Sequence, residues 1–226
     1  MSIPILVFYH GLFLMGDPPE LLPAAAEIIK DQMDRMAECG LTEAASEIRI
    51  GINGGVESTA FAYLLPSKAQ IFYHGLQCRN EIRTMLLIEE RLKQLEGEAY
   101  CLYFHAKGAS FPPGDIVRGR WRDRMFDNVV MKWKRALADL DSGFDAVGCH
   151  WLTPEQYRGL VGHPYFGGNY WIARASFLRT LPSLRETKEV KTHGIDAFES
   201  RYIAESWIGL GAKRPAIRDY HPGWPA

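Results

Sequence analysis

Short apolar runs alternate with longer amphipathic stretches along most of the chain. Residues 3–8 form a continuous apolar run, which is typical of a buried strand. Ile48, Ile50 and Ile52 alternate with an arginine and a glycine, which favours a second strand. By the same criteria, further strands are predicted at residues 69–74, 100–104, 144–149 and 170–172.

Between these runs, apolar residues recur at intervals of three and four, which is the spacing of one helix face. The first such face runs from Leu22 to Met36, and Gly40 follows at the usual stop position. Further helices are predicted at residues 82–95, at 121–140, shortly before Pro182 and at 198–206. The tail from Arg214 is rich in Pro, Gly and aromatic residues, so we expect it to pack as irregular chain.

Strand–helix alternation of this kind predicts an α/β fold whose mostly parallel sheet carries helices on both faces. The 226 residues contain 47% hydrophobic and 23% charged residues, which is ordinary globular composition. The pattern shows no repeat and no linker that would divide the chain. We therefore expect residues 1–226 to form a single Rossmann-like domain.

Charge and cysteine usage narrow the setting in which the protein works. The formal net charge is −1, whereas a sequence-independent nucleic-acid binder carries a basic surplus. The four cysteines form no C-x-x-C pair, which indicates a reducing compartment. The chain lacks an apolar run of roughly 18 residues and a basic leader, so we expect a cytoplasmic protein, free or attached at the inner membrane face.

Histidines stand at the ends of several predicted strands. In open α/β sheets the ligand crevice lies beyond the carboxyl ends of the strands, where His10, His74, His105 and His150 are expected. A lone histidine there is more often structural, which is our interpretation of His74 and His150. His105 and Lys107 together could instead neutralise a diphosphate without a metal.

Two further segments point to an anionic or sugar-like ligand. Arg118, Arg120 and Arg122 lie near a helix start, where the helix dipole disfavours cations, so an anionic partner would offset the cost. The segment from Phe166 to Trp171 joins two glycines to an asparagine and two aromatic residues, which suits the apolar faces and hydroxyl edges of a sugar. The alternative for this segment is the start of a strand with core aromatics.

Acidic residues allow both structural and catalytic interpretations. Asp196 and Glu199 fit a helix capping box, and they could equally supply a general base. Arg201 and Glu205 have the spacing of a surface ion pair on a helix. The acid-x-acid motif at residues 139–141 lies at the end of a predicted helix, which is the wrong place for a metal site at a strand end.

Four ordered segments together resemble small bacterial glycosyltransferases encoded with capsule and lipopolysaccharide biosynthesis. The segments span about residues 100–210 and comprise residues 102–108, 121–125, 166–171 and 199–207. The resemblance implies the A-type fold of nucleotide-sugar glycosyltransferases, a nucleotide-sugar donor, and transfer to a hydroxyl on a glycan, a lipid-linked or another acceptor.

The resemblance also implies roles for individual residues. If transfer inverts the anomeric centre, Glu199 is the first choice for the base that deprotonates the acceptor, and Asp196 is the second. Lys107 would stabilise the leaving diphosphate. The residues expected to bind the nucleotide or the sugar are Tyr9, His10, Gly11, His74, His105, Lys107, Arg122, Gly168, Asn169 and Trp171.

One departure from the family pattern concerns the metal. In most enzymes of this fold, an acid-x-acid pair after the central strand holds a divalent cation on the donor diphosphate. Here His105-Ala106-Lys107 occupies the analogous position, which leaves dependence on Mg²⁺ or Mn²⁺ open and assigns no metal ligand.

Two other classes of function remain in competition. The seven histidines could serve a metal-dependent hydrolase, although no H-x-H or H-E-x-x-H spacing occurs. A non-catalytic nucleotide- or sugar-binding module would keep the pocket and release no nucleoside diphosphate from any donor.

Overall fold

A seven-stranded sheet forms the centre of the protein, with the strand order β3-β2-β1-β4-β8-β5-β9. The computed structural model describes residues 2–12, 21–54, 62–75, 80–107, 109, 115–155, 162–188 and 200–222. The strands of this sheet are β1 (Ile5–Leu12), β2 (Glu47–Asn53), β3 (Gln70–Gly75), β4 (Tyr100–His105), β5 (Ala146–Gly148), β8 (Trp171–Arg174) and β9 (Ile217–Asp219). All of them are mutually parallel except β8, which runs antiparallel to both β4 and β5.

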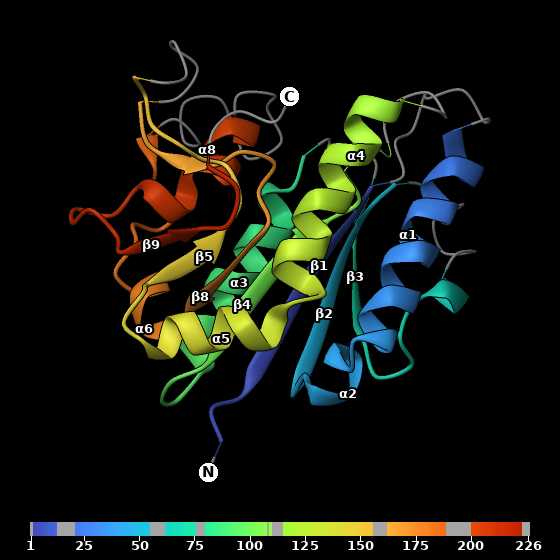
Figure 1. The fold of residues 1–226 in the computed structure, drawn as a ribbon, viewed down its shortest axis with the longest axis horizontal. Helices are drawn as coiled ribbons and strands as arrows, with labels where there is room; N and C mark the ends of the chain where they lie inside the picture. Colours follow the sequence, from blue (N-terminus) through green and yellow to red (C-terminus); the bar gives the residue numbers. More distant parts are fainter. Residues whose placement is uncertain are drawn as a thin grey trace.

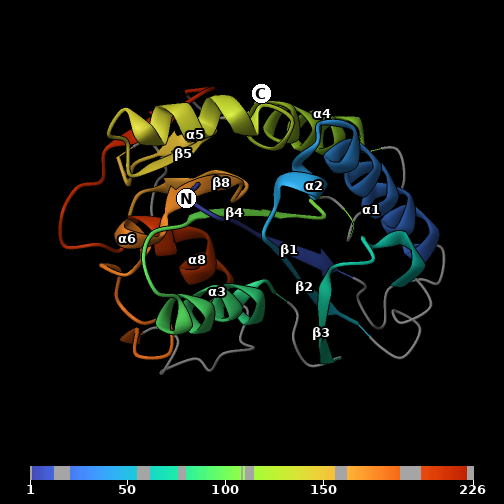
Figure 2. The same ribbon diagram turned by 90° about the horizontal axis from the view of Figure 1, so that it is seen from below.

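Helices cover both faces of this sheet (Figures 1 and 2). One face carries α1 (Leu21–Glu38), α2 (Leu41–Ala44), α4 (Ile116–Met125) and α5 (Trp133–Asp141). The other face carries α3 (Ile82–Gln94), α6 (Ala175–Leu178) and α8 (Ser200–Ser206). The predicted α/β fold class, a mostly parallel sheet with helices on both faces, is therefore confirmed.

Alternating side chains of each strand fill two hydrophobic cores. Along β1, Val7 and Tyr9 join the core under α1 and α5, whereas Leu6 and Phe8 join the core under α3 and α8. Because successive strand residues point to opposite faces, an apolar run without polar interruption is what a strand covered on both sides requires. This is why residues 3–8 and 100–104 could be identified as central strands.

Two strand predictions need correction. The tail is not wholly irregular, because Ile217–Asp219 forms the edge strand β9 beside β5. A separate two-stranded sheet, β6 (Trp151–Leu152) and β7 (Tyr165–Phe166), was not predicted. Strands of two or three residues are too short to show a period in the sequence.

The helix predicted at residues 121–140 begins earlier and is interrupted. The Asp115 carboxylate caps α4 by accepting a hydrogen bond of 3.0 Å from the Arg118 backbone N–H. Residues Phe126–Val130 then form a π-helical turn between α4 and α5, closed by the Met131 N–H on the Phe126 carbonyl at 3.0 Å. The extra residue in this turn rotates the helix, so that Phe126, Val129 and Val130 all face the core.

No helix within the described part of the chain has the length and apolar character that crossing a membrane requires.

The close contact between β2 and α3 predicts a position-specific effect of adding one methyl group. A Cβ at Gly51 would lie 2.1 Å from the Thr84 hydroxyl and 2.4 Å from the His74 Nε2. Gly51→Ala should therefore lower the free energy of unfolding by about 2 kcal/mol. The matched change Gly11→Ala, whose Cβ would meet its nearest heavy atom at 3.6 Å, should stay within about 0.5 kcal/mol. Urea unfolding measures both variants, and equal losses would contradict the packing described.

Candidate functional site

The site is set by a reversal in strand order. From β1, the sheet extends through β2 and β3 on one side and through β4 on the other. In open α/β sheets a ligand crevice forms at such a switch point, beyond the carboxyl ends of the strands. His10 of β1 and His105 of β4 are register partners at this place. Two of the four histidines expected at strand ends, His10 and His105, are therefore neighbours at the β1/β4 switch point.

A threonine links two of these histidines. The Thr84 hydroxyl, in the first turns of α3, lies 2.8 Å from His10 Nδ1 and 3.1 Å from His74 Nε2. A hydroxyl has one proton to donate, so it donates to one imidazole and accepts from the other. This arrangement agrees with the structural interpretation of His74. Thr84 was missed because nothing in helix periodicity shows which strand-end residues its side chain will meet.

His10 is held in its neutral form. Burial is the main cause that lowers the pKa of His10 well below its usual value, and the neighbouring His105 and His74 lower it further. The residue is 3% exposed. His10 is therefore not a cation for a phosphate at neutral pH, and its placement in a nucleotide pocket stays a prediction.

His105 joins the end of β4 to the glycine turn before β8. Its Nε2 donates a hydrogen bond of 2.8 Å to the Gly168 carbonyl, because a carbonyl can only accept. The ring is also parallel to Tyr103, at 6.4 Å between centroids, and tilted against Tyr170 at 5.3 Å. The sequence segments around His105 and Gly168 are thus adjacent, and the His105 proton lies on Nε2.

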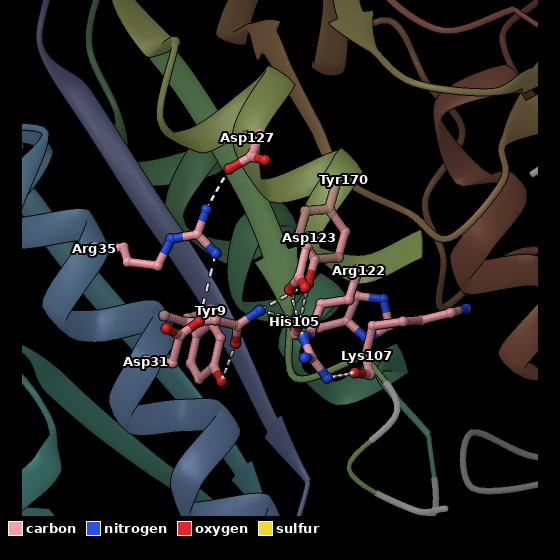
Figure 3. Close-up of polar contacts among 10 residues, drawn as sticks. Tyr9, Asp31, Arg35, His105, Lys107, Arg122, Asp123, Asp127 and Tyr170 are labelled. Carbon is pink, nitrogen blue, oxygen red and sulfur yellow. Dashed lines mark hydrogen bonds and ion pairs between the residues drawn. The ribbon is translucent and has the colours of Figure 1, made fainter. Parts of the chain in front are cut away.

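Lys107 and Arg122 add positive charge beside this turn (Figure 3). The Lys107 ammonium lies 4.1 Å from the centre of the Trp121 ring, and the residue is only 9% exposed. Arg122 Nη1 donates to the Lys107 carbonyl at 3.3 Å. Gly168 has φ +88, and a Cβ there would lie 2.6 Å from Met125 Sδ, so only glycine lets the turn approach α4 so closely.

Asn169 and Trp171, predicted to line the sugar side, are both completely buried. Trp171 Nε1 donates to Asn169 Oδ1 at 2.8 Å, and Asn169 Nδ2 donates to Glu81 Oε2 at 2.9 Å. The Tyr103 hydroxyl donates to the same carboxylate oxygen. These bonds give both side chains an interior role that supports the turn from within, and contact of either with a sugar stays a prediction.

A buried glutamine connects three elements around the His105 carbonyl. Gln32 of α1 donates from Nε2 to that carbonyl at 3.2 Å and to the Tyr170 hydroxyl oxygen at 2.9 Å, while its Oε1 accepts from the Tyr9 hydroxyl at 2.8 Å. Tyr170 also donates to the His105 carbonyl (Figure 3). Tyr9, expected to line the nucleotide pocket, thus directs its hydroxyl to the interior. Gln32 was missed because its partners lie 23 to 138 residues away.

The predicted carboxylates have different positions. Asp196 and Glu199 lie outside the described residues, as does Gly108. Glu205 was interpreted as part of a surface ion pair with Arg201, but it is only 7% exposed, so its predicted place on the surface is wrong. The acid-x-acid motif of α5 is incidental, as predicted. Asp139 accepts from the Tyr220 hydroxyl at 2.5 Å, and Asp141 accepts from Arg174 at 3.1 Å.

The residues described around the switch point do not fit a divalent metal. The chain leaves β4 through His105 and Lys107, where a cationic ammonium stands in place of a carboxylate. His105 Nε2 already carries the proton that it donates to Gly168. Within the described ranges, no three His, Cys, Asp or Glu side chains are grouped so that they could hold a metal ion.

Comparisons with known proteins give distant structural likenesses. No protein-family model and no curated protein matches the sequence. A protein from Desulfovibrio desulfuricans G20, assigned as a nucleotide-diphospho-sugar transferase, has 11% identity and a TM-score of 0.48, covering 98% of this chain and 81% of that one. The structure of CMP:2-keto-3-deoxy-manno-octonic acid synthetase complexed with CTP has 12% identity and a TM-score of 0.48, and the match covers 98% of this chain and 91% of that one.

A third solved structure is 4-diphosphocytidyl-2C-methyl-D-erythritol synthase from Anaerococcus prevotii DSM 20548. It has 9% identity and a TM-score of 0.46, and the match covers 99% of this chain and 90% of that one. Similarity at this level says nothing about the substrate or the reaction of this chain.

The Gln32 network predicts a pH-dependent defect. In Gln32→Glu the new carboxylate would face the His105 carbonyl and the Tyr170 oxygen, so the free energy of unfolding should fall by about 3 kcal/mol near pH 8. Burial raises the pKa of a carboxyl group, so the folded form binds the proton first and the deficit shrinks towards about pH 5. Gln32→Leu loses the same bonds and should show a deficit independent of pH. Urea unfolding at both pH values decides, and a constant deficit in Gln32→Glu would refute the network.

The neutral state of His10 predicts an acid sensitivity. Its pKa is lowered in the folded protein, so the unfolded chain binds the proton first as the pH falls. Stability should therefore decline below about pH 6.5, with a contribution from His10 of up to about 1.4 kcal/mol per pH unit. His10→Asn should have a shallower decline than the unchanged protein. Parallel stability curves for His10→Asn and the unchanged protein would rule out this contribution.

Proposed function

We propose that the protein is a glycosyltransferase that moves a sugar from a nucleoside diphosphate donor to a hydroxyl acceptor. The observation that carries this proposal is the pairing of Lys107 and Arg122 beside the glycine turn at the β1/β4 switch point. The proposal treats residues 1–226 as one domain. Its setting would be the synthesis of surface polysaccharide or another glycoconjugate, in keeping with the resemblance of the four sequence segments.

The chemistry proposed for Lys107 is stabilisation of the leaving diphosphate. Glycosyl transfer from such a donor leaves negative charge on the diphosphate, and fixed positive groups aimed at developing charge lower the barrier. Lys107 is only 9% exposed, and in such a site a charge interaction is stronger than in bulk water. The bond from Arg122 to the Lys107 carbonyl ties a second cation to the same loop.

The position of Lys107 on the Trp121 ring also supports this role. The face of an aromatic ring attracts a cation electrostatically, and the Lys107 ammonium lies over the Trp121 ring. Displacing the ammonium from the indole towards a phosphate would exchange a contact of roughly 1 kcal/mol for a charge-assisted hydrogen bond. Trp121 can therefore hold the ammonium by a cation–π contact until the donor binds.

The two acids predicted from the sequence remain the candidates for the base that deprotonates the acceptor hydroxyl. Glu199 directly precedes α8, which begins at Ser200, and Asp196 lies three residues before it. A carboxylate placed at the crevice could remove the hydroxyl proton as the sugar transfers. Glu199 remains the first choice and Asp196 the second.

The central test is release of nucleoside diphosphate from a panel of nucleotide sugars in the presence of acceptors. Lys107→Ala should lower kcat/KM by about 100-fold or more, because one fixed donor to developing charge is removed. Lys107→Arg should recover part of the loss, and Lys30→Ala, which changes an exposed lysine of α1, should have no effect.

Two outcomes would contradict the proposal. Unchanged kinetics in Lys107→Ala would remove the ammonium from the mechanism. Absence of nucleoside diphosphate release from every donor, together with binding of the intact donor, would favour the non-catalytic binding module. Unfolding curves for each variant separate both outcomes from loss of the fold.

A further inference from the structure

A cavity of about 550 Å³ is lined by residues of and around the small β6–β7 sheet. The helix α8 and the strand β9 lie at one end of the molecule (Figure 1). Three segments enclose the cavity, at residues 151–155, 163–164 and 209–215. A volume of this size falls in the usual range for small-molecule sites. Nothing in the proposed donor chemistry uses this cavity.

The lining combines flat apolar groups with cations. Trp151, Pro154 and Pro164 supply apolar surface, and Lys213 and Arg214 supply two permanent positive charges. Among the described lining residues the carboxylate is that of Glu155, whose pKa is lowered chiefly by a hydrogen bond from the Thr153 side chain and also by Arg214. Flat apolar faces suit sugar rings, and the excess positive charge suits an acidic substituent on them.

Asp219 fixes the backbone of Trp151, and Phe166 packs against its indole. Its backbone N–H donates to Asp219 Oδ2 at 2.8 Å, while Asp219 Oδ1 accepts from the backbone N–H groups of His150 and His221, each at 2.9 Å. The Trp151 ring also meets the Phe166 ring edge-on, at 4.8 Å between centroids. An indole fixed in this way loses little freedom when a ligand stacks on it.

A glycine gives the cavity its shape. A Cβ at Gly209 would lie only 1.8 Å from the Pro164 carbonyl oxygen, so no other residue would allow the 3₁₀ turn at Trp207–Gly209 to approach the start of β7 so closely. Both Gly209 and Pro164 line the cavity. Its floor is thus a close backbone contact between segments far apart in the sequence.

Along the polypeptide chain, one short strand leads from the cavity lining to the proposed donor site. β7 leads from Pro164, on the cavity lining, to Gly168, whose carbonyl accepts the His105 hydrogen bond. Four residues of chain span at most about 14 Å. The Gly167 N–H donates a hydrogen bond of 2.8 Å to the carbonyl of His150, the residue before Trp151. This bond fixes the segment between Pro164 and Gly168 next to Trp151.

We propose that this cavity is the acceptor subsite and that it binds an oligosaccharide bearing an acidic sugar. The sugar ring stacks on Trp151 and its carboxylate pairs with Lys213 and Arg214. The name acceptor subsite rests on the proposed glycosyl transfer. The binding of an acidic sugar does not, so it is tested without a donor.

The experiment compares two disaccharides that differ by one carboxylate, glucuronosyl-β-1,4-glucose and cellobiose. Each is titrated into the full ¹⁵N-labelled chain while the indole N–H signal of Trp151 is followed. The acidic disaccharide should shift this signal and bind about five-fold more tightly than cellobiose, the factor that one or two partly exposed ion pairs supply. The double change Lys213→Ala with Arg214→Ala should reduce its affinity to that of cellobiose.

Control variants keep the test independent of folding and of catalysis. Trp151→Phe should weaken both disaccharides, whereas Lys30→Ala on α1 should weaken neither. Equal affinities for the two disaccharides would overturn the proposal, and so would binding of the acidic disaccharide that leaves the Trp151 signal unmoved. The proposal would also be overturned if a free nucleoside diphosphate bound at Lys213 and Arg214 more tightly than the acidic disaccharide does. Nucleoside diphosphate release is measured in parallel. It shows whether the proposed glycosyl transfer fails while the binding of the acidic sugar holds.

Discussion

The hydrogen bond from His105 to the Gly168 carbonyl holds together the parts of the molecule from which the proposed function follows. It joins the end of β4 to the turn before β8, two segments separated by 63 residues. With this bond in place, Gly168 packs against Met125 of α4, and Trp121 of the same helix carries the Lys107 ammonium. The strand end, the glycine turn and the C-terminal half of α4 thus form one unit.

Buried polar groups stabilise this unit from both faces of the sheet. On one face Gln32 joins Tyr9, Tyr170 and the His105 carbonyl. On the other face Glu81 receives bonds from Tyr103 and Asn169. A buried polar group without a partner is costly, so each network favours one arrangement of the β4 loop over its alternatives. The precision that catalysis requires can come from such supports.

Sequence reasoning succeeded where one-dimensional spacing is sufficient. Apolar runs identified β1 and β4 because a strand covered on both faces has no polar side, and the histidines at their ends then had to share one edge of the sheet. It failed where the partner lies elsewhere in the chain. Nothing in the sequence singled out Gln32 of α1 or Glu81, which directly precedes α3, and β9 is too short to show a period.

The burial of Asn169 and Trp171 carries the same lesson. A glycine pair followed by an amide and two aromatics fits a sugar site and a folded interior equally well, because both environments favour flat apolar groups with a few polar atoms. Composition could not separate the two, whereas the bonds of Asn169 to Glu81 and Trp171 show an interior role. By contrast, Trp151 was not singled out from the sequence, although it lines the cavity beside β7.

The most direct measurement of the central claim is a crystal structure of the protein with a bound nucleoside diphosphate, chosen as the one that most raises the melting temperature. The account predicts the diphosphate within roughly 4 Å of the Lys107 ammonium, beyond the carboxyl ends of β1 and β4, with the bond between His105 and Gly168 intact. A nucleotide bound at another edge of the sheet, with Lys107 still resting on Trp121, would contradict it.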